Sequence, residues 1–179
     1  MKRTVWTFGL ISGAVMAAFM AATMPFVGDH GVADMLVGYA GMVAAFLLVY
    51  FGVRSYRDNV LGGIISFGRA FSAGILIAAI ASLCYVASWE VIYYKFMPDF
   101  YAKYGQSMVE QTRKAGKSDA EVAQVRAEMD TMVKRVENPL FVMVMTFGEP
   151  FPVGLVIALV SAGVLRRKRA AHGAVLATA

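Results

Sequence analysis

Apolar positions along this chain fall into four long blocks with polar residues between them. The segments 5–27, 35–53 and 71–89 contain no charged residue, and the segment 139–165 contains a single one, Glu149. Each block is long enough, at about 1.5 Å per residue in a helix, to cross roughly 30 Å of hydrocarbon. The pattern predicts an all-α integral membrane protein with four transmembrane helices, at about 5–27, 35–53, 69–94 and 139–165.

The composition supports this class. Hydrophobic residues make up 59% of the 179 positions and charged residues 16%, whereas a soluble domain is about 45–50% apolar and about 25% charged. A cleavable signal peptide is the alternative for the first block, which follows "MKR". Because the apolar part of such a peptide spans only about 7–15 residues, we expect a retained first helix.

Basic residues predict the orientation of the helices. They flank the first block (Lys2, Arg3), the second connection (Arg54, Arg57, Arg69) and the end of the fourth block ("RRKR", 166–169), whereas the first connection, "GDHGVAD", has none. By the positive-inside rule, both termini, including a tail at 166–179, and the second connection are expected in the cytoplasm. The net charge of +5 is then mostly an orientation signal. Membrane lipids are expected partners, and nucleic acid is not.

The polar segment 95–138 is predicted to form an extracytoplasmic helical hairpin between the third and fourth membrane helices. Its first half follows Pro98 and ends at Gly116, a natural residue for a helix C-terminus. Its second half begins with Ser118 and Glu121 at the spacing of a capping box. Both halves carry apolar side chains at helical spacing, and these would bury one another. The alternative is a docking surface or lid for a second copy or a partner membrane protein.

Small residues recur at every fourth position in three of the membrane helices. They are Gly9, Gly13, Ala17 and Ala21 in the first, Ala70, Gly74, Ala78 and Ser82 in the third, and Gly154, Ala158 and Ala162 in the fourth. Such stripes let helix backbones approach closely within lipid. They predict packing faces, and they leave open whether each face meets its own bundle or another copy.

The fourth block carries Glu149 beside two prolines, in "TFGEPFPVG". Pro150 and Pro152 cannot donate to the carbonyls of Thr146 and Gly148, so a helix that begins near Pro139 is expected to bend there. The loosened turn would offer free carbonyls beside an anionic side chain.

The interpretation of Glu149 and Glu90, the acids of the fourth and third membrane helices, depends on how deep in the membrane they lie. Glu149 lies roughly 25 Å along a helix from Arg166, and Glu90 roughly 31 Å from Arg69, which places both carboxylates near the outer rim of the membrane. A candidate polar site around Glu149 could hold water, a cation, or a hydrogen-bond donor from Tyr85, Tyr93 or Lys95. The alternative is a structural kink with a solvated glutamate.

No other pattern predicts chemistry. The two histidines, His30 and His172, are expected on opposite sides of the membrane, and a single cysteine, Cys84, cannot form a cysteine-based metal cluster. Sequence motifs of nucleotide-binding proteins, serine hydrolases and zinc proteases are missing. We therefore expect no metal, no cofactor and no catalytic residue.

The order of features along the chain resembles a known family. The segments "WEVIYY" and "TFGEPFPVG", separated by a charged helical insert, are similar to the bacterial membrane proteins of domain of unknown function 4199. The resemblance covers nearly the whole chain and implies a four-helix protein of the bacterial inner membrane. It implies no activity, substrate or catalytic residue.

Three functions are compatible with these patterns. The first is a structural, assembly or accessory role in the bacterial envelope, because packing stripes and an external hairpin are the main features. The second is a small oligomeric permease for an ion, a proton or a solute, with Glu149 as the binding carboxylate. The third is a lipid-modifying membrane enzyme, which no motif supports.

Overall fold

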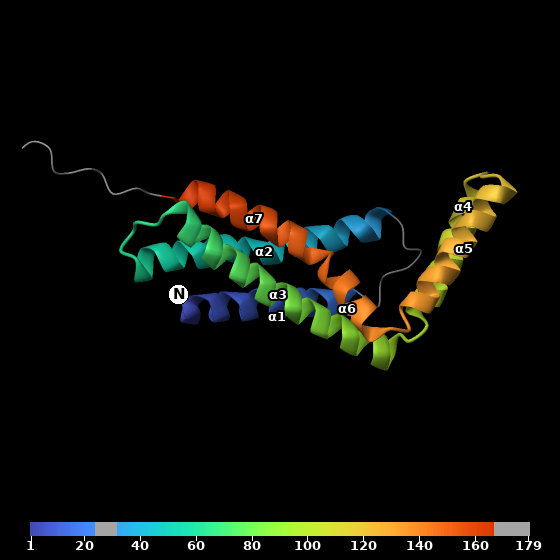
Figure 1. The fold of residues 1–179 in the computed structure, drawn as a ribbon, viewed down its shortest axis with the longest axis horizontal. Coiled ribbons are helices and arrows are strands. Elements are labelled where there is room, and N and C mark those ends of the chain that lie inside the picture. The colour runs from blue at the N-terminus through green and yellow to red at the C-terminus, as the bar shows by residue number, and fades with distance from the viewer. Residues whose placement is uncertain (24–31, 167–179) are drawn as a thin grey trace, which may run out of the picture.

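The structure of this protein is a computed structural model that describes residues 1–23 and 32–166. The predicted end of the first helix at 24–27, most of the predicted tail, and both histidines, His30 and His172, lie outside the described residues. Within them the chain is all-helical (Figure 1). The helices are α1 (Lys2–Thr23), α2 (Val32–Val60), α3 (Phe67–Phe96), α4 (Phe100–Lys114), α5 (Asp119–Arg135), α6 (Pro139–Phe147) and α7 (Pro150–Leu165).

Four stretches of the described chain are long and apolar enough to cross a membrane. They are Lys2–Thr23, Leu36–Val60, Phe67–Phe96 and Pro139–Leu165, the last of which combines α6 with α7. The predicted class, an all-helical membrane protein with four spans and a helical hairpin between the third and fourth, is confirmed.

The four spans form one bundle in which α3 packs against α1 and α7, and α2 packs against the same two helices (Figure 1). The start of α1, the connection from α2 to α3 and the end of α7 lie at one end of the bundle. The α4–α5 hairpin projects from the opposite end. Odd-numbered crossings therefore run one way and even-numbered crossings the other, as a four-span chain requires.

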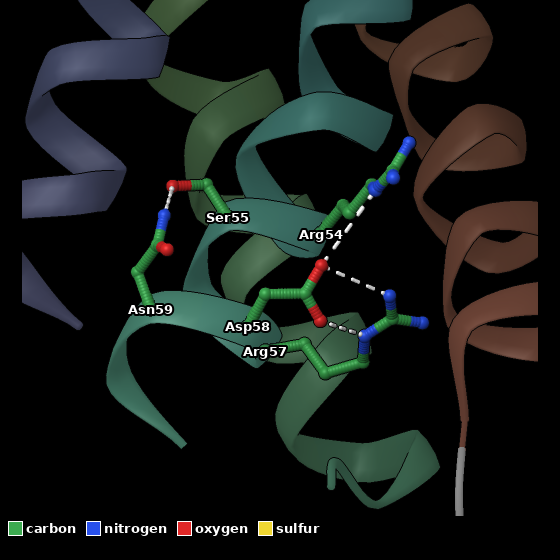
Figure 2. Close-up of polar contacts among 5 residues, drawn as sticks. All are labelled: Arg54, Ser55, Arg57, Asp58 and Asn59. Carbon is green, nitrogen blue, oxygen red and sulfur yellow. Dashed lines mark hydrogen bonds and ion pairs between the residues drawn. The ribbon is translucent and has the colours of Figure 1, made fainter. Parts of the chain in front are cut away.

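The second span is longer than its apolar block. The sequence pattern ends it at Val53, but α2 continues to Val60 through a charged stretch. Figure 2 shows the reason: Arg57 donates to Asp58 through Nε at 2.6 Å and Nη2 at 3.0 Å, and Asn59 donates to Ser55 at 3.1 Å. These polar side chains satisfy one another along the last turns of α2, so the helix does not end where the hydrophobicity ends.

The small residues of α1 face α3 of the same chain. A side chain at Gly9 would meet Ile80, and one at Gly13 would meet Cys84. Between them Ser12 is buried and donates to the carbonyl of Ala45 in α2, at 2.8 Å. This part of the stripe lies within the bundle and holds three helices together.

The stripe of α1 does not keep the same burial along its length. Ala17 is half-buried, and Ala21 is exposed. In this second half of α1 the buried positions are instead occupied by Met16 and Met20. The close approach to α3 is therefore restricted to the first half of α1.

The closest contact between α3 and α7 is also built from small residues. A Cβ at Gly74 would lie 3.0 Å from the Cβ of Ala158, and a Cβ at Gly154 would lie 2.8 Å from that of Ala78. The two pairs are reciprocal, glycine against alanine in each case. The side chain of Phe46 from α2 reaches the same place and is fully buried. The centre of the bundle is thus filled by short side chains around one large ring.

The hairpin follows its sequence signals. Ser118 accepts from the backbone of Glu121, whose side chain in turn accepts from the backbone of Ser118 at 3.0 Å, so the predicted capping box is present. Gly116, in the turn before it, has φ +72, a conformation that favours glycine. The apolar stripes of α4 and α5 pack on each other, with Val109 and Val122 buried between the helices. The stripes therefore form the interior of the hairpin.

Candidate functional site

Glu149 lies at the break between α6 and α7. The side chain of Asn138 caps α6 by accepting from the backbone of Leu140 at 3.0 Å, and Pro139 occupies the first turn. The helix ends at Phe147, and Pro150 starts α7 after Gly148 and Glu149. A proline has no N–H for the preceding turn, so the hydrogen-bond ladder is interrupted here. The expected bend is thus an interruption between two helices, visible in Figure 1 as a change of direction.

The carbonyl of Thr146 is not left free at this interruption. The backbone N–H of Glu149 donates to it at 3.4 Å, while that of Gly148 donates to the carbonyl of Val144 at 3.1 Å. The expectation of a free carbonyl at Thr146 is therefore wrong, because a tighter turn takes over the bond that Pro150 cannot make. What the turn offers to a ligand is the carboxylate of Glu149.

Among the three expected donors, Tyr85 reaches this carboxylate. Its hydroxyl, from the middle part of α3, donates to Oε2 of Glu149 at 3.1 Å. Tyr93 instead packs among aromatic rings, 6.2 Å from Trp89 between centroids, and Lys95 is exposed at the end of α3. Among the described residues, Glu149 has no ion-pair partner. The hydrogen bond from Tyr85 fixes the carboxylate without neutralising it.

Glu90 does not belong to this arrangement. It is half-buried on α3, and its Oε1 is enclosed without a hydrogen-bond partner among the described residues. It does not line the cavity beside Glu149. The two acids of the spans are therefore separate features.

Trp89 is the centre of an aromatic cluster where the hairpin joins the bundle. Its indole packs against Phe100 at 4.9 Å and Tyr101 at 6.3 Å between centroids, and its Nε1 donates to the hydroxyl of Tyr101 at 3.2 Å. Phe100 in turn stacks on Tyr104 at 6.3 Å. These contacts join the end of α3 to the start of α4, so the aromatic cluster anchors the hairpin.

Tyr101 is the titratable group of this cluster that lies outside the four spans. Burial raises its pKa to about 12, although the hydrogen bond from Trp89 acts in the opposite direction. The phenol is therefore neutral at physiological pH, and its oxygen serves as the acceptor for the indole N–H.

A cavity of about 280 Å³ lies between Glu149 and the aromatic cluster. Its lining comes from α3, α4, α5, α6 and the break between α6 and α7, and consists of Tyr85, Trp89, Phe100, Tyr101, Tyr104, Met132, Met145, Thr146 and Glu149. Ligand pockets are usually about 300–1,000 Å³, so this one suits a small group.

The sequence prediction included part of this cavity and missed the rest. The sequence predicts Glu149, Thr146 and Tyr85 near one another, but it does not connect the rings of Trp89 and α4 with them. The signal that could have joined them is the short distance along the chain between "WEVIYY" and "FYAKY". A tight turn between two helices brings aromatic residues on both sides of it together.

The described residues contain no group of three or more His, Cys, Asp or Glu side chains that could hold a metal ion. The cavity has a single carboxylate, Glu149, and its other side-chain oxygens are the hydroxyls of Tyr85, Tyr101, Tyr104 and Thr146, whereas Ca²⁺ and Mg²⁺ are held mainly by carboxylate and carbonyl oxygens and water. The chemistry that the cavity offers is a single negative charge among aromatic rings.

The family described as "Protein of unknown function (DUF4199)" matches residues 7–167. No curated protein and no solved structure matches the chain. The match spans most of the chain and confirms the resemblance seen in the sequence, so this protein belongs to the DUF4199 family.

Proposed function

We propose that this protein is an accessory component of the bacterial inner membrane that presents a helical hairpin outside the cytoplasm to another envelope component. In this proposal both termini are cytoplasmic and the protein itself carries out no reaction. The observation that carries it is the α4–α5 hairpin, which leaves the bundle as a separate, anchored arm (Figure 1).

The distribution of charge supports this orientation. Arg54, Arg57 and Arg69 lie at the end of the bundle where the chain starts, opposite the hairpin. Asp58 pairs with Arg57 there (Figure 2), but acids contribute little to the positive-inside rule. The segment 95–138 also carries eight basic residues, but long connections translocate largely regardless of charge, so the basic residues next to the spans favour that end for the cytoplasm.

The surface of the hairpin supports a contact role. Its apolar side chains are used between α4 and α5, and the outer surface carries charges of both signs in local pairs, such as Lys114 with Glu110 and Lys117 with Glu121. Exposed pairs of this kind add little stability. A polar arm held firmly at its base is suited to a reversible contact with another polar surface.

A permease that uses Glu149 is the second candidate, because this carboxylate lies within the Pro139–Leu165 span. The packing of the bundle argues against a path through one copy. Ala78, Ala81 and Ala158 are fully buried at its centre, beside the ring of Phe46. Transport would therefore need a path between copies.

Flux measurements in proteoliposomes separate the two candidates. The accessory role predicts no cation or proton flux above that of empty liposomes, and a Glu149→Gln variant with unchanged thermal stability, because glutamine can still accept from Tyr85. Glu90→Gln is the matched control, another acid of a span away from the cavity. Flux that disappears in Glu149→Gln and persists in Glu90→Gln would replace the accessory role with the permease.

A further inference from the structure

The cavity beside Glu149 combines aromatic walls with an unneutralised carboxylate. The ring planes of Trp89, Phe100 and Tyr101 differ by 80°, 82° and 85° from one another. All three rings line the cavity, together with the ring of Tyr104. Ring faces carry the negative part of the aromatic quadrupole, and they attract cations.

The polar end of the cavity attracts the same kind of ligand. Glu149 is exposed toward it, Tyr85 holds the carboxylate in place, and the described lining contains no lysine, arginine or histidine. A cation bound there would meet the carboxylate on one side and ring faces on another. The hydration that it loses is replaced by these contacts instead of by a set of oxygen ligands.

We propose that this cavity binds an organic ammonium group, of the kind found in choline or ethanolamine. An inorganic divalent ion does not suit it, because the lining supplies only one carboxylate. A neutral apolar group does not suit it either, because it would desolvate the charge of Glu149, which accepts from Tyr85, without supplying a positive partner. The volume of about 280 Å³ is sufficient for a small headgroup. The site is independent of the accessory role proposed above and would exist equally in a permease.

The place of the cavity suggests two sources for the ammonium group. It lies where α3 and α6 meet the hairpin, and the distance of Glu149 from Arg166 along the span places it near the outer rim of the membrane, close to the lipid headgroups. The group can therefore belong to a membrane lipid or to a small free solute. Both sources share the chemistry of a positively charged organic nitrogen.

Trp89 provides a direct reporter of binding. The protein has two tryptophans, Trp89 and Trp6. Trp6 is 58% exposed near the start of α1, away from the cavity. A Trp6→Phe protein therefore retains only the tryptophan in the cavity. In nanodiscs of phosphatidylglycerol, choline is expected to change the emission of Trp89 in a saturable way. The neutral compound of the same shape, 3,3-dimethylbutan-1-ol, is expected to have an affinity at least roughly tenfold lower than that of choline. Equal responses to both compounds, or none to choline, would overturn the proposal.

Two substitutions test the residues. Glu149→Gln and Phe100→Leu, each in the Trp6→Phe protein, are expected to weaken choline binding roughly tenfold. Their controls are Glu90→Gln and Phe96→Leu, which remove an acid and a ring outside the cavity; Phe96 is 75% exposed. Glu149→Gln keeps the shape of the side chain, and near-ultraviolet circular dichroism verifies the fold. Unchanged choline affinity in correctly folded Glu149→Gln would contradict the proposal.

Changing the nanodisc lipid distinguishes the sources. A lipid headgroup in the site predicts that phosphatidylcholine or phosphatidylethanolamine shifts the Trp89 emission before any choline is added and competes with choline afterwards. A free solute predicts the same choline curve in every lipid. Both results support an ammonium site, whereas emission that responds to neither lipid nor choline excludes one.

Discussion

Replacing Gly13 by isoleucine is expected to separate α1 from α3 and to destabilise the bundle by about 3 kcal/mol, the upper part of the usual range for an overpacked core. A Cβ at this position already collides with the side chain of Cys84, and the Cα of Ala81 lies 3.6 Å away. Isoleucine adds further carbons in the same direction, and α3 cannot yield because α7 packs on its other side. Thermal unfolding in detergent, followed by circular dichroism, should show a midpoint lower by on the order of 10 °C.

Gly163→Ile is the matched control for this prediction. Gly163 is an exposed glycine of α7, and a side chain there would meet nothing within 4 Å. The same enlargement should leave the midpoint unchanged or raise it slightly, because isoleucine is a better helix former than glycine. If both substitutions lower the midpoint equally, close packing at Gly13 is not what holds α1 to α3.

Truncating Trp89 to alanine is expected to loosen the base of the hairpin at a cost of about 3–5 kcal/mol, as for other large buried rings. Trp89 is 6% exposed, contacts three further aromatic residues and donates to Tyr101. Its removal leaves a space that these rings fill poorly and an acceptor without its donor. Limited trypsin digestion should then cut the connection around Lys117 much faster than in the unmodified protein.

Trp6→Ala removes the same side chain from an exposed position and serves as the control. It should leave the digestion pattern unchanged, because Trp6 lies on α1 at the other end of the bundle. A hairpin that resists trypsin equally in Trp89→Ala would show that the anchor lies elsewhere, for instance at Val136 and Val142, which are buried in the same hydrophobic core as Trp89.

The sequence predicts those parts of the fold that depend on the length of an apolar segment or on residues close to one another along the chain. A span must be long and apolar, so its existence can be read from composition. The capping box at Ser118 and the turn at Gly116 depend on neighbours within a few residues, and both are present as expected. The hairpin follows from two amphipathic helices joined by that turn.

Features that depend on contacts across the bundle cannot be predicted from the sequence pattern alone. The small residues of α1 predict close packing, but only the structure assigns Gly9 and Gly13 to α3 of the same chain. The continuation of α2 past Val53 depends on polar side chains that satisfy one another, which hydrophobicity does not register. The carbonyl of Thr146 likewise accepts from the backbone N–H of Glu149, although the lack of an N–H on Pro150 alone predicts that this carbonyl is free.

The cavity shows why the candidate site was predicted only in part. Glu149 is conspicuous as a charge within an apolar block, so sequence reasoning starts from it. Trp89 and Phe100 are not conspicuous, because aromatic residues are common at the ends of membrane spans and on the apolar faces of helices. Their arrangement around one space depends on the angle between α3 and α4, and no periodicity along the chain specifies that angle.

The threading of the chain is the central claim of this account, and cysteine labelling tests it most directly. In a Cys84→Ala protein, single cysteines would be placed at Lys117, in the turn of the hairpin, and at Asn59, at the end of α2, both exposed. Treated with a membrane-impermeant maleimide, intact spheroplasts should label Lys117→Cys and leave Asn59→Cys unlabelled until the membrane is broken. Labelling of Asn59→Cys in intact spheroplasts, with Lys117→Cys protected, would contradict the orientation, and equal labelling of both would contradict the four-span threading.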